Sequence, residues 1–175
     1  PAVTRPVKEM ILNGIDISLY KDHKKRDFRV ELGLSDNIFL IGFLGRFMSQ
    51  KGFKYLVEAL ENIHAQTGLS RKPVLLVFSS DGFIREEKEI ISLKKLDNVI
   101  RFLPPVDNVS EVINGLDIVA MPSLWEACGL LAMETLISGK PLIASNCIGL
   151  REVIEGSPTF IVKPGDTQSL ANAIM

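Results

Sequence analysis

Cysteine is scarce in the 175-residue sequence, which has only Cys128 and Cys147. Neither cysteine has the spacing of metal ligands, so we expect both to be free thiols in a reducing cytosol. A catalytic cysteine is the alternative interpretation. It ranks well below the first one, because the two histidines, His23 and His64, lie in polar or helix-surface stretches.

Long apolar runs are absent as well. No stretch approaches the roughly 20 residues that a membrane-spanning helix needs, and residues 1–5 do not begin a signal peptide. Charge of one sign is not in excess either, because 20 Lys and Arg stand against 21 Asp and Glu, for a net charge of −1. No strong overall field therefore favours nucleic acid or an anionic membrane. We expect no nucleic-acid partner and no membrane association through this domain.

The sequence does have the composition of one ordinary globular domain, with 46% hydrophobic and 23% charged residues. A chain of this length can bury roughly 70% of its unfolded surface, so a core does not require disulfides. The chain begins at Pro1 rather than at a methionine, and it stops within the helical pattern of residues 169–175. We therefore expect a piece of a longer protein.

Apolar runs and amphipathic stretches alternate from residue 37 onwards. The runs predict strands at 38–44, 74–78, 99–103, 117–121, 142–145 and 159–162. Helical spacing of apolar residues predicts helices at 53–66, 84–93, 109–114, 129–138 and 149–154, and from about residue 167. Continuous apolar runs are typical of strands covered on both faces. We expect an α/β fold with a doubly wound, Rossmann-like, mostly parallel six-stranded sheet at 37–175, after a mixed, polar lead-in segment at 1–36.

The first candidate site follows the first predicted strand, in the loop that begins at Gly45. Glycine allows the backbone to approach a ligand closely, and Arg46 and Lys51 carry donors suited to phosphate oxygens. The loop has neither G-x-G-x-x-G nor G-x-x-x-x-G-K-[ST], so the sequence supports neither a dinucleotide fingerprint nor a P-loop ATPase. The alternative for Arg46 and Lys51 is a pair of solvated basic residues in a surface loop.

The second candidate site is the glutamate pair Glu126 and Glu134, with Gly129 between them. Glu126 lies in a predicted strand-to-helix loop and Glu134 in the following helix, whose first amides are free to bind phosphate. A nucleotide sugar needs both kinds of group, because carboxylates accept hydrogen bonds from its hydroxyls and backbone amides bind its phosphates. In one alternative, Glu126 merely complements the helix dipole and Glu134 lies on the solvent face of the helix. In another, the pair hydrolyses a glycoside, which ranks lower because the cationic first loop suits an anionic ligand.

The third candidate site is the segment 100–105, where a predicted strand ends at Pro104 and Pro105. A loop stiffened by two prolines can present fixed backbone groups to a planar base. The alternative is a plain strand terminator, and these residues taken alone favour it.

Together these motifs resemble the retaining glycosyltransferases of the GT-B fold, family 4, and in particular their C-terminal, donor-binding domain. The matching segments follow the family's order from about residue 12, at 13–16, 45–52, 101–104, 122–134, 139–145 and 163–166. The first of these segments matches the family's linker between its two domains. The resemblance implies that an N-terminal, acceptor-binding domain of the same chain is missing here and that this fragment alone transfers little or no sugar. It also implies a cytoplasmic protein, which could reach the inner face of the membrane only through the missing domain.

The resemblance implies roles for the polar residues that match the family's motifs. Arg46 and Lys51 would hold the donor diphosphate, beside Gly45. Glu126 would accept hydrogen bonds from the hydroxyls of the transferred sugar. Glu134 would bind the ribose hydroxyls. The expected catalytic residues are therefore Glu126, Arg46 and Lys51.

Backbone groups would supply the remaining donor contacts. The amides around Gly129, Leu130 and Leu131, at a helix start, would contact sugar and phosphate, and the loop after Phe102 and Leu103 would hold the base. Two departures from the family pattern carry no assigned role. Residues 79–82 replace a Gly-x-Gly-like turn, and Cys128 stands where an aromatic residue is common, although glycogen-synthase-like relatives also have cysteine there.

The implied reaction moves a sugar from a nucleoside diphosphate sugar to an acceptor hydroxyl of a glycan, lipid or polysaccharide, and the anomeric configuration is retained. The donor is a substrate and no cofactor is expected. We expect no essential metal, because the sequence has no Asp-x-Asp motif. The alternatives are a non-catalytic nucleotide-sugar-binding module and a GT-B sugar epimerase. A phosphorylase would need a lysine for pyridoxal phosphate, and no motif marks one.

Overall fold

The computed structural model of the chain describes residues 13–20, 24–66, 68–79 and 84–175. These residues form one six-stranded sheet in which every pair of neighbouring strands is parallel. In chain order the strands are β1 (Ile38–Leu44), β2 (Lys72–Phe78), β3 (Ile100–Leu103), β4 (Ile118–Met121), β5 (Leu142–Ser145) and β6 (Phe160–Val162). All six predicted strands are confirmed, and their bounds shift by no more than two residues.

The order of the strands across the sheet is β3-β2-β1-β4-β5-β6. The chain builds outward from β1 to one edge and then returns to start β4 on the other side of β1. The point at which the winding reverses therefore lies between β1 and β4, which pair through Ile41 with Ile118 and Gly42 with Val119. In such sheets the ligand crevice lies beyond the carboxyl ends of the strands at this switch point. The predicted doubly wound α/β fold is confirmed.

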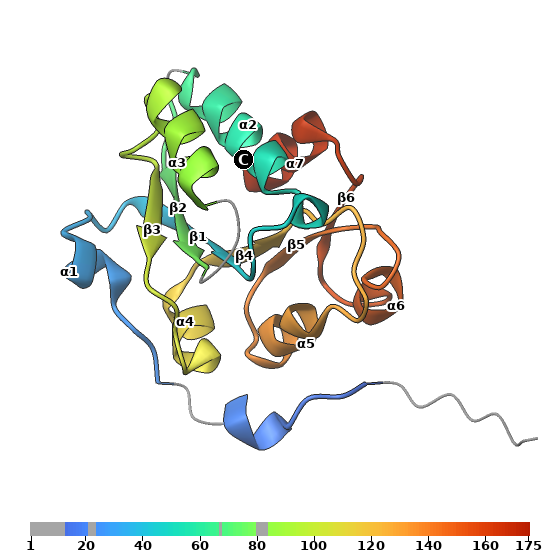
Figure 1. Ribbon diagram of the computed structural model, residues 1–175. Helices are drawn as coiled ribbons and strands as arrows, with labels where there is room; N and C mark the ends of the chain where they lie inside the picture. The colour runs from blue at the N-terminus through green and yellow to red at the C-terminus, as the bar shows by residue number, and fades with distance from the viewer. Residues whose placement is uncertain (1–12, 21–23, 67, 80–83) are drawn as a thin grey trace, which may run out of the picture.

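Helices cover both faces of the sheet (Figure 1). One face carries α2 (Phe53–His64), α3 (Ile84–Leu93) and α7 (Thr167–Ile174), and the other carries α1 (Phe28–Leu32), α4 (Val109–Gly115), α5 (Leu130–Ile137) and α6 (Arg151–Ile154). Alternate strand residues supply the two cores, because successive side chains of a strand point to opposite faces. In β1, for example, Ile41 and Phe43 belong to the core beneath α2, and Leu40 to the core beneath α4.

Three short elements have no counterpart among the predicted ones: the 3-10 turns η1 (Ile17–Tyr20) and η2 (Ser49–Lys51), and α1. Phe28 of α1 is buried and packs against Phe78, with 5.4 Å between the ring centroids. The packed core therefore begins before residue 37, within the polar lead-in segment. The apolar residues of α1 alternate with Arg29 and Glu31, a two-residue period that is not helical, and five residues are too few for a helical period, which is why the sequence did not reveal this helix.

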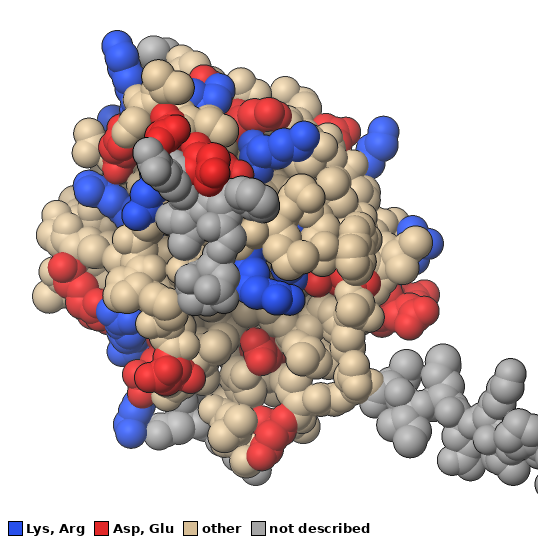
Figure 2. Space-filling view, in the orientation of Figure 1, with Lys and Arg blue, Asp and Glu red and all other residues tan. Residues whose placement is uncertain are grey.

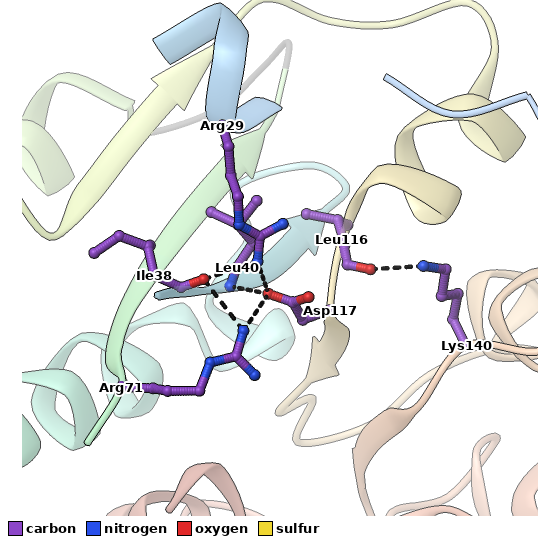
Figure 3. Close-up of polar contacts among 7 residues, drawn as sticks. All are labelled: Arg29, Ile38, Leu40, Arg71, Leu116, Asp117 and Lys140. Atoms are coloured by element: carbon purple, nitrogen blue, oxygen red, sulfur yellow. Dashed lines mark hydrogen bonds and ion pairs between the residues drawn. The ribbon is translucent and has the colours of Figure 1, made fainter. Parts of the chain in front are cut away.

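Polar contacts hold the elements together at the amino-terminal ends of the strands (Figure 3). Asp117, just before β4, accepts a hydrogen bond from the backbone N–H of Leu40 at 2.7 Å and another from the guanidinium of Arg29. Lys140 donates to the carbonyl of Leu116 at 2.9 Å, and burial lowers the pKa of this lysine. These contacts join α1, β1 and β4, so the charged residues here serve the fold. The loops of the candidate site lie at the opposite side of the sheet, beyond the carboxyl ends of the strands.

Candidate functional site

Two loops meet beyond the carboxyl ends of β1 and β4. The first loop is 45–52 and the second is 122–129, and a cavity of about 320 Å³ lies between them. The cavity is at the β1–β4 switch point, where a doubly wound sheet binds its ligand. Its walls bring together six residues singled out from the sequence: Gly45, Lys51, Glu126, Gly129, Leu130 and Leu131.

Backbone contacts join the two loops directly. The N–H of Leu124 donates to the carbonyl of Gln50 at 2.7 Å. Gly52 has a φ of +69°, and a Cβ at this position would lie 2.0 Å from the carbonyl oxygen of Pro122. Only glycine fits both this conformation and this close approach. The spacing of the loops, and hence the width of the cavity, is therefore set by backbone rather than by mobile side chains.

A third segment, after β5, supports the second loop from behind. The N–H of Glu126 donates to the carbonyl of Ile148 at 2.9 Å. Gly149 has a φ of +82°, and a Cβ there would lie only 1.8 Å from the carbonyl oxygen of Glu126. This support holds the backbone of Glu126 against the loop that follows β5.

An ion pair spans the cavity between Lys51 and Glu126. The Lys51 ammonium lies 2.8 Å from Oε1 and 2.9 Å from Oε2 of Glu126. The Glu126 side chain is 8% exposed and that of Lys51 is 24% exposed. Ser123 donates from its hydroxyl to Oε1 of Glu126 at 2.7 Å. A carboxylate this far removed from water needs such partners to remain stable, so the first and second candidate sites form one electrostatic unit.

Arg46 differs from Lys51 in its surroundings. It is exposed, and within the described ranges no hydrogen bond or ion pair engages its guanidinium. It lines a second hollow of about 190 Å³, which shares Leu44 and Gly45 with the first cavity and extends toward Pro105 and Val106. The free donors of Arg46 are therefore available to an anion lying across the end of β1, between the two hollows.

The start of α5 supplies backbone donors to the first cavity. Gly129 precedes the helix in the left-handed conformation, with a φ of +42°, and a Cβ there would meet the side chain of Leu150 at 2.5 Å. The N–H groups in the first turn of a helix have no acceptor within the helix. Leu130 and Leu131 lie in that turn and line the cavity, so amides and the positive end of the helix dipole face it.

Glu134 lies one turn further along α5 and is not among the described residues that line the first cavity. Its carboxylate faces the phenol of Tyr20 in η1. Burial of that phenol, together with the charge of Glu134 and a hydrogen bond to it, raises the pKa of Tyr20 to about 12. The lead-in segment therefore packs against α5 beside this glutamate, a contact that the sequence did not predict.

Phe102 and Leu103 pack into the fold rather than along the cavities. The Phe102 ring lies 5.8 Å from that of Phe47 and 6.4 Å from that of Phe53, centroid to centroid, and the ammonium of Lys88 lies 5.0 Å from its centroid. Leu103 packs against the opposite core. Neither residue lines either cavity as described. The nearby loop reaches the second hollow through Pro105, which belongs to the third candidate site, and through Val106, which sequence reasoning did not single out.

No cluster of three or more His, Cys, Asp or Glu side chains is placed to hold a metal ion within the described part of the chain. No helix in that part is long and apolar enough to cross a membrane. Basic and acidic side chains are interspersed over the face that Figure 2 shows. The expectation that no metal or cofactor is needed stays a prediction.

Residues 38–175 match the family model described as Glycosyl transferases group 1. An uncharacterized glycosyltransferase of Methanocaldococcus jannaschii is 31% identical over 172 residues, which cover 93% of this chain and 43% of that protein. A D-inositol 3-phosphate glycosyltransferase of Rhodococcus opacus is 30% identical over 173 residues, which cover 95% of this chain and 39% of that protein. The chain therefore spans about two fifths of the length of these relatives.

Solved structures share the fold. Anabaena HepE, crystallised with UDP and glucose, has a TM-score of 0.76 at 29% identity, and the match covers 93% of this chain and 45% of HepE. A glycosyltransferase of Rickettsia africae has a TM-score of 0.80 at 24% identity, over 92% of this chain and 44% of that one, and this likeness supports the fold alone. The family model, the relatives and the sheet order agree, so this chain, with the Rossmann-like sheet of the GT-B fold, belongs to the glycosyl transferases group 1 family.

Proposed function

We propose that this chain is the donor-binding, C-terminal half of a retaining glycosyltransferase of family 4, which moves a sugar from a nucleoside diphosphate sugar to an acceptor hydroxyl. The observation that carries the proposal is the cavity at the β1–β4 switch point, where Lys51, Glu126 and the start of α5 converge. A cation, a carboxylate and free amides in one cavity match the diphosphate and the sugar hydroxyls of such a donor.

The donor would lie along the carboxyl edge of the sheet. Its diphosphate would contact Lys51, Arg46 and the first amides of α5, and its sugar would contact Glu126. The ribose would lie against α5 and take the place of the Tyr20 phenol as the partner of Glu134, and the base would enter the second hollow beside Pro105. This arrangement uses both cavities, which adjoin at Leu44 and Gly45.

Charge stabilisation is the chief contribution of this half to the reaction. As the bond between sugar and phosphate breaks, negative charge grows on the departing diphosphate. The start of α5 is fixed by the fold, and Arg46 and Lys51 would turn toward the diphosphate beside it, so that these three groups together would stabilise that charge. The departing phosphate can itself take the proton of the acceptor hydroxyl, so the reaction requires no protein base in this half.

The relatives suggest which donor to try first. HepE has been crystallised with UDP, with UDP and glucose, and with UDP-glucose, and its identity to this chain is 28–29%. We therefore propose UDP-glucose as the first donor to test. The relatives that act on D-inositol 3-phosphate make a phosphorylated polyol one acceptor worth including beside glycans and lipids.

The acceptor site would belong to a preceding domain of the same protein. The relatives are more than twice as long as this chain, and residues 13–16 match the linker between the two halves. Positioning of donor against acceptor can supply several kcal/mol of barrier lowering. We therefore propose that residues 1–175 alone bind donor but transfer little, and that the whole protein works in the reducing cytosol, in keeping with its two free cysteines.

Substitution of the two glutamates tests the proposed donor placement. Glu134→Gln should weaken the binding of UDP itself, because ribose is present with or without the sugar. Glu126→Gln should weaken UDP-glucose but not UDP, whose affinity should stay the same or rise because Lys51 is released from its ion pair. Isothermal titration calorimetry of both variants with both ligands measures this division. An equal loss of UDP affinity in Glu126→Gln and Glu134→Gln would show that the two roles are wrongly assigned.

A further inference from the structure

The Glu126 carboxylate has a partner that the sequence pattern did not identify. Ser123 is 2% exposed, and its hydroxyl donates to Oε1 of Glu126 at 2.7 Å. The two residues are three positions apart in the loop after β4. Inside the protein, a buried hydroxyl with a fixed acceptor has no water to exchange with, so this hydrogen bond fixes one orientation of the carboxylate.

Ser123 is itself held from the neighbouring strand. The hydroxyl of Ser145, the last residue of β5, donates to the carbonyl of Ser123. Ser145 is fully buried, and β5 pairs with β4 in parallel. The chain of contacts thus runs from the end of one central strand, through Ser123, to a carboxylate at the wall of the cavity. Its anchor is the sheet and not a surface loop.

We propose that Ser123, held by Ser145, is the positioning residue that fixes the Glu126 carboxylate for the sugar of the donor. This inference rests on the proposed function, because it assumes that Glu126 binds that sugar. It adds a residue to the machinery and explains how a glutamate in a loop keeps a fixed direction.

The arrangement of donors around Glu126 supports this role. Lys51 contacts both carboxylate oxygens, whereas Ser123 contacts Oε1 alone. An ionised carboxylate has about four acceptor sites, so room remains for sugar hydroxyls. When a diphosphate enters, Lys51 is drawn toward the phosphate oxygens. The Ser123 hydroxyl has no phosphate to move toward in this arrangement. It therefore keeps its hydrogen bond to the carboxylate while Lys51 contacts the phosphate.

The experiment compares ligands with and without the sugar, in the 175-residue chain. Ser123→Ala removes the hydroxyl and leaves the rest of the residue in place. We expect it to weaken UDP-glucose by about tenfold, the order of one hydrogen bond to a charged group, and to leave the affinity for UDP within about twofold. Ser123→Thr restores a hydroxyl and should recover most of the loss. Calorimetry with the two ligands gives both affinities.

Ser110→Ala is the matched control. Ser110 is also a buried serine, 5% exposed, but its hydroxyl has no hydrogen-bond partner among the described residues. It lies in α4 and lines neither cavity, although its neighbour Val109 lines the second hollow. Its substitution should change neither affinity. A purely structural effect of Ser123→Ala would instead weaken UDP and UDP-glucose alike and would not respond to threonine.

The result for Glu126→Gln distinguishes a failure of the positioning role of Ser123 from a failure of the proposed function. If Glu126→Gln lowers the affinity for UDP-glucose and Ser123→Ala does not, the positioning role of Ser123 is wrong and the proposed function stands. If Glu126→Gln has no effect on UDP-glucose, the sugar-binding role of Glu126 is wrong, and the inference about Ser123 fails with it.

Discussion

Replacement of Lys51 by methionine is expected to weaken nucleoside diphosphate binding more than tenfold and to lower the stability of the fold at the same time. The affinity falls because one charge-assisted contact to phosphate, about 1.5–3 kcal/mol, is lost. It falls further because the Glu126 carboxylate, 8% exposed, is left without its cation and repels the incoming diphosphate. Stability falls because a buried carboxylate that loses its partner retains the full cost of its desolvation.

Arg46→Ala is the control that separates the two effects of Lys51. Both substitutions remove one positive charge from the same loop, but Arg46 is exposed and has no hydrogen bond or ion pair within the described residues. We expect Arg46→Ala to weaken UDP binding about tenfold through its lost phosphate contact and to leave the midpoint of urea unfolding unchanged.

A second substitution tests the cause. Glu126→Gln added to Lys51→Met removes the unpaired carboxylate, and it should return much of the stability and part of the UDP affinity. The double variant should therefore be more stable than Lys51→Met alone, as a double-mutant cycle would measure. If Lys51→Met unfolds like the wild type and binds UDP equally well, the ion pair has no part in nucleotide binding.

Gly149→Ala is expected to destabilise the fold by roughly 2–5 kcal/mol, the sum of a left-handed backbone penalty and a steric overlap. Its φ is +82°, and the added Cβ would lie 1.8 Å from the carbonyl oxygen of Glu126. Neither atom belongs to a flexible side chain, so the backbone of the second loop has to move. Because Glu126 moves with it, the affinity for UDP-glucose should fall as well. Urea unfolding and calorimetry measure the two losses.

Gly156→Ala is the matched control for this effect. Gly156 has a similar φ of +69°, but open space surrounds the position of its Cβ. Its substitution should cost only the backbone penalty, about 1–2 kcal/mol, and should leave ligand affinity unchanged. Equal losses of stability in the two variants would mean that the loop after β5 does not hold Glu126 in place.

The sequence was sufficient to predict the fold because strands buried on both faces are continuous apolar runs, which are distinct in composition from the amphipathic helices between them. The convergence of the loops at 45–52 and 122–129 followed from one rule, that parallel strands at a switch point end at the same edge. The cavity beside β1 and β4 lies where that rule places it.

The pairing of side chains could not be predicted in the same way. Lys51 and Glu126 are 75 positions apart, and their ion pair depends on the spacing that Gly52 and Pro122 impose on the two loops. The loop after Phe102 was expected to hold the base through backbone groups, but the sequence did not show that the Phe102 ring packs against the aromatic cluster of the core. The direction in which a side chain points depends on contacts between segments that are distant in the sequence. A pattern of residue types does not predict those contacts.

The central claim is that a nucleoside diphosphate sugar binds between the loops after β1 and β4. Titration of the isotope-labelled 175-residue chain with UDP-glucose, followed by amide chemical shifts, tests it most directly, with GDP-glucose and ADP-glucose as parallel titrations. The account predicts saturable binding of at least one of these donors, with the largest shifts at residues 45–52 and 123–131. Shifts confined to the opposite edge, around Asp117 and Lys140, or no binding of any of the three donors, would contradict it.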